Sequence, residues 1–228
     1  GANPTVNHPV AATWMKNAMQ RGTRFIVADP RGTELGRHAW RFLQFKADTD
    51  VALLNAMLHT IVEEGLVNEA FVRDRSSGYE ALAANVKAFS PELMSPVCGI
   101  PAETIREVAR AYATSKGSMI LWGMGISQHI HGTDNARCLI ALAVATGQIG
   151  RPGTGLHPLR GQNNVQGASD SGLIPMMYPD YQRVDNPEAK VRFEKLWGRD
   201  LAPKPGLTVV EIVNAACEGK IRGMYIMG

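Results

Sequence analysis

Near its middle the chain reads Ser118-Met119-Ile120-Leu121-Trp122-Gly123-Met124-Gly125-Ile126-Ser127-Gln128. A run of apolar residues closed off by glycine is typical of a short buried strand that ends in a turn. The same arrangement occurs earlier, where the apolar segment 24–28 is followed by Asp29-Pro30-Arg31, and proline cannot continue a central strand. Both segments therefore predict strands that open into loops at their carboxyl ends.

Patterns typical of helices surround these two strands. Pro9 suits the first position of a helix that Gly22 can end, and Thr49 can cap a longer helix that ends near Gly65. Apolar periodicity predicts further helices over 77–88, 101–115, 133–147 and 208–218, and the apolar run 224–227 predicts a closing strand. Apart from that last helix and the strand, we expect the chain from 168 onward to be mostly loop. Strands that alternate with helices indicate an α/β fold with a mostly parallel sheet flanked by helices. A boundary near residue 160 would divide the chain into domains 1–160 and 161–228.

The composition is that of an ordinary globular protein, and it argues against nucleic acid as a partner. The chain has 228 residues, of which 45% are hydrophobic and 20% are charged. Its formal net charge of +3 arises from 24 basic and 21 acidic residues that are spread along the sequence. Nucleic-acid binding needs basic residues gathered on one face, and the sequence offers no such stripe.

The cysteines and the apolar segments bear on metal sites and on the membrane. Cys98, Cys138 and Cys217 lie far apart and form no C-x-x-C motif, so these residues alone predict neither a zinc site nor an iron–sulfur cluster. We expect reduced, mostly buried thiols. No run approaches the roughly 18 apolar residues of a membrane span, and no signal-peptide pattern opens the sequence, so the cytoplasm is the default location.

Residues 160–167 carry the densest group of hydrogen-bonding side chains in the chain. They read Arg160-Gly161-Gln162-Asn163-Asn164-Val165-Gln166-Gly167. Arg160 has a planar, permanently charged fork of donors that suits a carboxylate or a phosphate, while each amide side chain offers both a donor and an acceptor. The two glycines let a ligand approach the backbone closely. The loop could hold a small anion beside a polar ring, although the same residue types are equally common in a solvated turn.

Carboxylates stand where the predicted strands end and the helices begin. Ligands of parallel sheets bind at the carboxyl ends of the strands, where Asp29 could accept hydrogen bonds from a ribose or a guanine. A turn residue or a helix cap is the alternative for Asp29. Asp48 and Asp50 could contact a nucleotide likewise, but the start of a helix favours acidic residues for capping alone.

Several common catalytic and binding motifs are missing. The glycine pair at 123 and 125 would need a third glycine at position 128 to form a dinucleotide fingerprint, and Gln128 stands there. The sequence contains neither a G-x-x-x-x-G-K-[ST] phosphate loop nor a G-x-S-x-G nucleophile elbow. His129 and His131 alternate without a third ligand nearby, so they predict no metal site.

Five motifs, taken in order, give the chain a family resemblance. They are Gly1-Ala2-Asn3-Pro4 with His8-Pro9, Ala28-Asp29-Pro30-Arg31, Leu121-Trp122-Gly123-Met124-Gly125, Thr146-Gly147-Gln148-Ile149-Gly150-Arg151-Pro152-Gly153, and the loop 160–167 followed by Ala168-Ser169-Asp170. Over essentially its whole length the chain resembles the catalytic subunits of molybdenum- or tungsten-dependent formate dehydrogenases, within the dimethyl-sulfoxide-reductase family of molybdopterin enzymes. The loop 160–167 is the element specific to the formate branch.

The resemblance implies a bis(molybdopterin guanine dinucleotide) cofactor with molybdenum or tungsten, held between two α/β domains, and oxidation of formate to carbon dioxide. Residues 1–160 would form a Rossmann-like domain that binds the cofactor, and residues 161–228 part of a second α/β domain. Arg160 matches the arginine that orients formate, and Gln162 matches a supporting amide of the active site. The positions that match cofactor-binding residues are Asn3, Asp29, Arg31, Asp50, Met124, Gln128, Gly161, Asn163, Val165, Gln166 and Gly167.

The resemblance also implies parts that this sequence lacks. Many relatives carry glycine where Asp48 stands, which weakens the predicted nucleotide contact there. A metal-binding cysteine or selenocysteine, the histidine after it and the cysteine motif of an iron–sulfur cluster are expected upstream of Gly1, and an acidic residue with a proline just after Gly228. We therefore expect residues 1–228 to be a piece of a longer enzyme that works with electron-transfer subunits, and to show little or no turnover alone.

Two alternatives stay open at the level of the sequence. The chain could be a non-catalytic nucleotide-binding or subunit-interaction module of the same fold, although such a scaffold has no need of Arg160 beside four amides. It could also belong to another molybdopterin reductase, such as a nitrate reductase, which the loop 160–167 disfavours. Metal analysis of the full-length protein would separate a metalloenzyme from a module.

Overall fold

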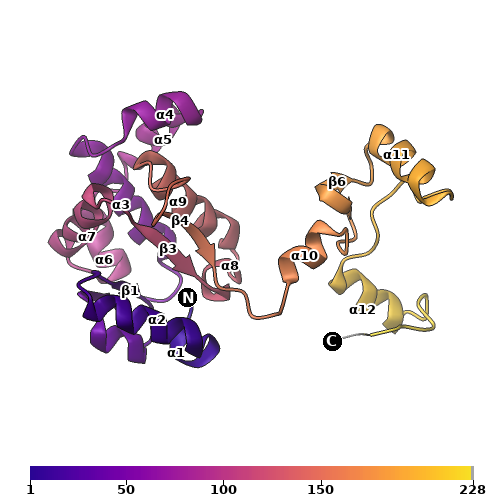
Figure 1. The fold of residues 1–228 in the computed structure, drawn as a ribbon, viewed down its shortest axis with the longest axis horizontal. Helices are drawn as coiled ribbons and strands as arrows, with labels where there is room; N and C mark the ends of the chain where they lie inside the picture. Colours follow the sequence, from indigo (N-terminus) through magenta and orange to yellow (C-terminus); the bar gives the residue numbers. More distant parts are fainter. Residues whose placement is uncertain (227–228) are drawn as a thin grey trace. The chain divides into compact units, whose positions relative to one another are not determined.

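The structure is a computed structural model that describes residues 1–226 and divides the chain into two compact units. The first unit comprises Gly1–Gly161, and the second begins at Gln162 (Figure 1). The junction falls inside the loop 160–167, so that Arg160 and Gly161 belong to the first unit and the rest of the loop to the second.

The first unit is rich in helices and contains four short strands (Figure 1). Its helices are α1 (Pro4–Asn7), α2 (Pro9–Gln20), the 3-10 helix η1 (Glu34–His38), α3 (Asp50–Glu63), α4 (Glu69–Arg75), α5 (Tyr79–Val86), α6 (Pro91–Cys98), α7 (Ala102–Thr114), α8 (Met124–Ser127) and α9 (Gly132–Ala145). Its strands are β1 (Ile26–Ala28), β2 (Arg41–Leu43), β3 (Met119–Trp122) and β4 (Gly155–Pro158). The helices predicted in this part of the chain are confirmed as α2, α3, α5, α7 and α9, and the two predicted strands as β1 and β3.

Local residues explain where several helices begin and end. Pro9 occupies the first position of α2, as predicted. Ser90 caps α6, because its side chain accepts a hydrogen bond from the backbone N–H of Leu93. Thr49 precedes α3, but the predicted side-chain cap is wrong: the Thr49 hydroxyl donates to the carbonyl oxygen of Lys46 at 2.6 Å. That hydroxyl closes the preceding turn instead of satisfying the free amides of the helix.

The core of the first unit lies where α3 packs against α6, α7 and α9. Ile61 of α3, Ile105 of α7 and Leu142 of α9 each have at most 1% of their surface exposed. Burying a side chain of this size contributes about 1.5–3 kcal/mol relative to leaving it in water. Because the loops that end at α3 and α9 join directly onto these packed helices, the core also fixes the positions of residues 48–50 and 128–131.

The parallel strands predicted from the sequence are present, but they form two small sheets. β1 pairs with β2 and β3 pairs with β4, both in parallel. Within residues 1–226 no strand links the two pairs, and β1 and β3 both line an apolar hollow of about 950 Å³. The α/β class and the parallel pairing are thus confirmed, whereas the expected single sheet is divided.

The second unit consists of short elements and has a small, largely aromatic core. The elements are α10 (Val165–Asp170), β5 (Met177–Tyr178), the 3-10 helix η2 (Pro179–Tyr181), β6 (Gln182–Arg183), α11 (Pro187–Trp197) and α12 (Val209–Cys217). Tyr178, Val184 and Phe193 are buried, and the rings of Tyr178 and Phe193 lie 4.9 Å apart. β5 pairs with β6 in antiparallel fashion. The helix predicted over 208–218 is confirmed as α12.

Two expectations for the second unit are wrong. α11 lies in a region expected to be loop, although Asn186 caps it, Pro187 opens it and Gly198 follows it with a φ of 64°. The closing strand predicted over 224–227 is absent from residues 224–226, while Met227 lies outside the described residues. A strand needs a neighbour to satisfy its backbone hydrogen bonds, and no described segment pairs with this one.

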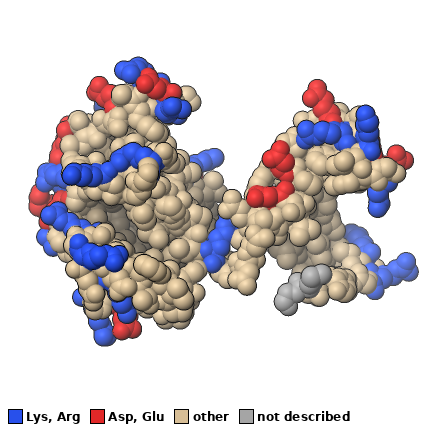
Figure 2. Space-filling model, in the orientation of Figure 1, with Lys and Arg blue, Asp and Glu red and all other residues tan. Residues whose placement is uncertain are grey.

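The surface and the thiols of the molecule agree with ordinary globular packing. Figure 2 shows basic and acidic side chains near one another over the visible face of the first unit. Ion pairs join α3 to α7, for example that of Arg106 and Glu63 at 2.9 Å. Cys98 and Cys138 are buried free thiols, and Cys217 is an exposed one. Every helix of residues 1–226 falls short of the length and apolar character that a membrane span needs.

Candidate functional site

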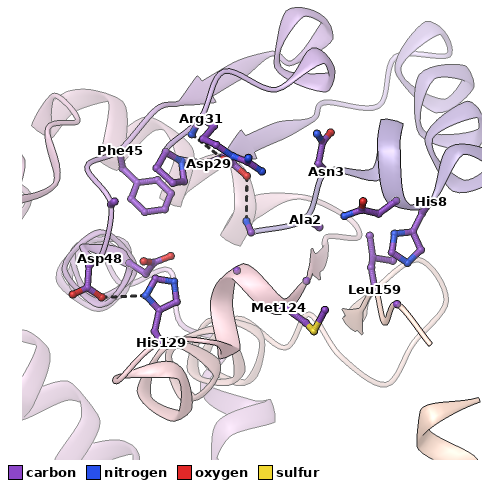
Figure 3. A pocket seen from close by; sticks show the side chains of 18 residues that line it. Ala2, Asn3, His8, Asp29, Arg31, Phe45, Asp48, Met124, His129 and Leu159 are labelled. Carbon is purple, nitrogen blue, oxygen red and sulfur yellow. Dashed lines mark hydrogen bonds and ion pairs between the residues drawn. The ribbon is translucent and has the colours of Figure 1, made fainter. Parts of the chain in front are cut away.

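A cleft of about 600 Å³ opens in the first unit at the carboxyl ends of β1 and β3 (Figure 3). Asp29 directly follows β1, Gly123 directly follows β3, and both line the cleft. Asn3, just before α1, and Asp50, at the first position of α3, line it as well. The cleft therefore occupies the edge at which parallel α/β sheets bind their ligands.

Glycines allow two backbone segments to meet at one wall of the cleft. The backbone N–H of Gly125 donates to the carbonyl oxygen of Gly1 at 3.1 Å. A Cβ atom on Gly125 would lie 2.5 Å from the Cα of Gly1, and one on Gly123 would lie 2.8 Å from the Gly1 oxygen. Neither position has room for a side chain. The glycine pair that partly resembles a dinucleotide fingerprint is explained by this contact between the backbones.

Asp29 closes the end of β1 and turns its carboxylate toward the cleft. Its backbone N–H donates to the carbonyl oxygen of Leu43 at 3.2 Å, which extends the pairing of β1 and β2 by one residue. The residue is buried, and its Oδ1 accepts a hydrogen bond from the backbone N–H of Arg31 at 2.9 Å. Its Oδ2 lies 3.5 Å from the backbone nitrogen of Gly1 (Figure 3). The turn predicted as the alternative role of Asp29 is present, and the carboxylate still has acceptor positions to offer.

Asp48, Asp50 and His129 form an ionisable group at another wall of the cleft. His129 Nδ1 donates to Asp48 Oδ1 at 3.1 Å (Figure 3), and this bond raises the pKa of His129. Asp50 is only 6% exposed, and burial raises the pKa of its carboxyl above the ordinary 3.8. The attraction of His129 acts in the opposite direction and is the smaller effect. No described side chain donates a hydrogen bond to Asp50, so a ligand can do so.

Three more predicted residues line the cleft with different chemistry. Asn3 Oδ1 accepts a hydrogen bond from the hydroxyl of Thr5 at 2.8 Å, which fixes the amide at the start of α1. Arg31 is exposed beside Asp29 (Figure 3) and brings a positive charge to the rim. Met124 begins α8 and is 47% exposed. The cleft thus offers an amide, a guanidinium and a thioether together with its carboxylates.

Arg160 lies just beyond the end of β4, at the edge of the cleft. The backbone N–H of Leu159 donates to the carbonyl oxygen of Trp122, which extends the pairing of β3 and β4. His8 Nε2 donates to the carbonyl oxygen of Arg160 at 2.8 Å. Leu159 and Gly161 line the cleft, whereas Arg160 between them is exposed and does not. The backbone at this position borders the cleft, and the guanidinium is accessible to solvent.

The predicted site residues fall into three groups. Those that the cleft brings together are Asn3, Asp29, Arg31, Asp50, Met124 and Gly161. Gln128 and Arg160 are exposed neighbours of cleft residues but do not line it. Gln162, Asn163, Val165, Gln166 and Gly167 belong to the second unit.

Within the second unit the loop residues lead directly into α10. Asn164 adopts a left-handed conformation with a φ of 53°, and Val165 begins the helix. A Cβ atom on Gly167 would lie 2.4 Å from the Oδ1 of Asn164, so a larger residue at 167 would displace the exposed side chain of Asn164. Gln162, Asn163 and Gln166 are exposed. Their roles in binding or catalysis stay predictions.

Several lining residues have no role predicted from the sequence. The cleft is also lined by His8, Phe45 and His129. In the sequence His8 is part of a motif, His129 is a weak candidate for a metal ligand, and no pattern marks Phe45. His8 meets Arg160 across 152 positions of sequence and His129 meets Asp48 across 81, so no local pattern signals either contact. In residues 1–226 no three or more His, Cys, Asp or Glu side chains gather in a way that could hold a metal ion.

Sequence comparison relates the chain to known enzymes. Residues 1–228 match the family described as Molybdopterin oxidoreductase. The chain is 42% identical over 229 residues to formate dehydrogenase H of Escherichia coli, a match that covers 100% of this chain and 32% of that protein. It is 40% identical over 228 residues to the F420-dependent formate dehydrogenase subunit alpha of Methanocaldococcus jannaschii, with 100% of this chain and 33% of that protein covered.

A solved structure is similar as well. Acetylene hydratase from Pelobacter acetylenicus is 26% identical and superimposes with a TM-score of 0.61 over 63% of this chain and 20% of that one. The chain spans about a third of the length of the curated relatives described above. Together, the family match over residues 1–228 and the identity to these relatives confirm the resemblance: the chain belongs to the molybdopterin oxidoreductase family.

Proposed function

We propose that this chain binds part of the cofactor and orients the substrate in a molybdenum- or tungsten-dependent formate dehydrogenase, which oxidises formate to carbon dioxide. Both relatives are named as formate dehydrogenases, which supports formate as the substrate. The observation that carries the proposal is the position of Arg160, which follows β4 at the edge of a cleft lined by buried carboxylates. A positive charge beside such a cleft suits a small anion that reacts next to a bound cofactor.

The cleft fits one nucleotide of a bis(molybdopterin guanine dinucleotide). Guanine and ribose present N–H and O–H donors, for which Asp29 and Asp50 supply buried carboxylate acceptors. Arg31 can pair with a pyrophosphate, and the wall made by Gly123 and Gly125 presents backbone to the ligand. The volume of about 600 Å³ lies within the usual range of ligand sites, about 300–1,000 Å³. We assign Asn3, Asp29, Arg31, Asp50, Met124 and Gln128 to this nucleotide.

Arg160 would bind the carboxylate of formate. Two parallel N–H groups of its guanidinium match the two oxygens of the substrate, and its charge offsets theirs. Formate held in this way presents its C–H bond in one direction, which lowers the barrier through positioning and electrostatic stabilisation. The metal centre, when bound, accepts the two electrons released as formate becomes carbon dioxide and a proton. Gln162 would add an amide donor beside the substrate.

The rest of the loop 160–167 would extend the lining of the cofactor. We assign Gly161, Asn163, Val165, Gln166 and Gly167 to this role. A Cβ atom on Gly161 would meet nothing within 4 Å, so the backbone there is open to a ligand. Exposed amides at Asn163 and Gln166 supply donors and acceptors for a polar ring system.

The relatives also suggest the context in which the chain works. One of them is a subunit alpha, and this chain matches about a third of it. We propose that the intact enzyme is cytoplasmic, passes electrons to partner subunits, and obtains its metal-binding cysteine or selenocysteine and an iron–sulfur cluster from sequence outside residues 1–228.

The proposed function is tested by kinetics of the full-length, cofactor-loaded enzyme and its Arg160→Ala variant. We expect the variant to show a higher formate KM and a lower kcat, with kcat/KM reduced roughly ten- to hundredfold, as for loss of a charge-assisted contact. Arg37→Ala is the matched control, because Arg37 is an exposed arginine that does not line the cleft. Unchanged kinetics in Arg160→Ala would refute the role of Arg160.

A non-catalytic module of the same fold is separated from the enzyme by metal analysis. The proposal predicts that the full-length protein, purified with its cofactor, contains molybdenum or tungsten and oxidises formate. A protein that folds and binds a guanine nucleotide but contains neither metal would instead be such a module.

A further inference from the structure

His8 is held firmly between two helices of the first unit. Its backbone N–H donates to the carbonyl oxygen of Pro4 at 3.0 Å, at the end of α1, and its carbonyl oxygen accepts from the N–H of Ala12 at 2.9 Å, at the start of α2. Pro9 restricts the backbone of His8 further, because a residue before proline has fewer allowed conformations. The imidazole therefore extends from a well-fixed point.

The ring of His8 holds the chain just before the junction of the two units. Its Nε2 lies 2.8 Å from the carbonyl oxygen of Arg160, and the ring lies beside Leu159 in Figure 3. A carbonyl oxygen can only accept, so Nε2 carries the hydrogen of this bond. Nδ1 is buried without a partner among the described residues. No other hydrogen bond in the described part of the chain reaches the backbone of Arg160 or Gly161.

We propose that His8 is a positioning residue for Arg160, an inference that rests on the proposed role of Arg160 in binding formate. The hydrogen bond restrains the peptide from which the guanidinium extends. Without it, the hydrogen bond from Leu159 to Trp122 would be the last restraint on this stretch, and the guanidinium would sample more orientations. The Arg160 guanidinium would then be correctly oriented for formate less of the time, which lowers both the affinity for formate and the turnover.

The test uses the full-length, cofactor-loaded enzyme with three substitutions. His8→Phe keeps a ring but removes the donor, and His8→Gln returns an N–H donor. Val10→Ala is a control two residues away, in α2, because Val10 is 73% exposed. We expect His8→Phe to lower kcat/KM for formate roughly three- to tenfold, the effect of losing one neutral hydrogen bond. His8→Gln should restore most of the loss, and Val10→Ala should resemble the wild type. Cofactor content should be equal in all.

Two measurements distinguish positioning from a general effect on structure. Hydrogen–deuterium exchange of the peptide that contains residues 159–161 should become faster in His8→Phe and recover in His8→Gln. In an Arg160→Ala background, His8→Phe should cause no further loss of kcat/KM, because the two residues act through one contact with the substrate.

The outcomes separate this inference from the proposed function. Unchanged exchange at residues 159–161, or an equal kinetic loss in both backgrounds, would overturn it. The inference would also be overturned if the His8→Phe enzyme bound less cofactor but kept an unaltered kcat/KM per bound metal. If the wild type oxidises no formate, or Arg160→Ala matches it, the proposed function fails, while the exchange experiment still reports whether His8 restrains the loop.

Discussion

At the scale of one residue, the carboxylate of Asp50 shows how a group that suits a ligand can lower the stability of the folded protein. The start of a helix favours a carboxylate through its free amides, and His129 adds an attraction. Burial outweighs both effects and raises the pKa of Asp50, so the charged form is disfavoured in the folded protein. A carboxylate kept in such a place fits the proposed role of accepting donors from a guanine or a ribose.

Replacing Asp50 by Asn should therefore stabilise the cofactor-free chain at neutral pH. Because the folded pKa lies above the unfolded value of about 3.8, folding is weakened once pH rises through the folded pKa, and the penalty vanishes below the unfolded value. The melting temperature of Asp50→Asn should exceed that of the wild type near pH 7, and the gap should shrink as pH falls toward 4. The variant should also retain less cofactor, since an amide offers one acceptor oxygen. A gap independent of pH would contradict this account.

The pair of Asp48 and His129 should have the opposite dependence on pH. The hydrogen bond to Asp48 raises the pKa of His129, so its contribution to stability is complete below the unfolded pKa of about 6.5 and is lost as pH rises through the folded pKa. We expect Asp48→Asn to lower the melting temperature more near pH 6 than near pH 9. Asn suits the left-handed φ of 64° at this position, and Asp74→Asn is an exposed control. Equal losses at both pH values would exclude this charge effect.

At the scale of the elements, the contact of residues 1–3 with α8 shapes one wall of the cleft. In Gly125→Ala the gain in helix propensity is about 1 kcal/mol, but the new Cβ would lie 2.5 Å from backbone, which cannot rotate away. We expect a net destabilisation of about 1–3 kcal/mol, measured by chemical unfolding, and weaker cofactor binding. Gly32→Ala is the control, because a Cβ there meets nothing within 4 Å. Equal stability of the two variants would show that this contact is dispensable.

The sequence predicts the helices and strands that are marked by a pattern within their own residues. α7 buries one face, so its apolar periodicity is visible. α3 is buried on several sides and carries apolar residues along most of its length, and β3 is a continuous apolar run closed by glycine. β4 contains Gly155 and Pro158 and is a strand only because β3 lies beside it, so no local pattern marks it. The sequence does not predict α11, because the polar residues of this helix mask its apolar periodicity, even though Asn186 and Pro187 mark its start.

The same distinction applies to the candidate site. Asp29 and Asp50 could be predicted as rim residues because one ends a strand and the other begins a helix. His8 and His129 could not, because each acts through a partner that only folding brings near. The roles of the loop 160–167 rest on resemblance, since its side chains are exposed and make few contacts that reveal a purpose.

At the scale of the whole molecule, the two units differ in how much of each is buried. α3 alone contributes eight buried residues to the first unit. Among the described residues, the core of the second unit consists of Tyr178, Val184, Ala189 and Phe193, and α12 adds no buried residue. Because apolar burial is the main favourable term in folding, the second unit has much less to hold it together.

The rates of backbone amide exchange in residues 1–228 should therefore differ widely between helices. We expect the slowest exchange in α3 and, of the helices with nine or more residues, the fastest in α12. The capping box of Thr208 and Glu211 is complete and contributes about 1 kcal/mol, but a helix of nine residues without tertiary packing is marginal in water. Val209 and Val210 are 75% and 66% exposed, so they give α12 almost no such packing. Mass spectrometry should find amides of 209–217 exchanged long before those of 50–63. Similar protection in the two helices would mean that burial does not set the order in which this chain opens.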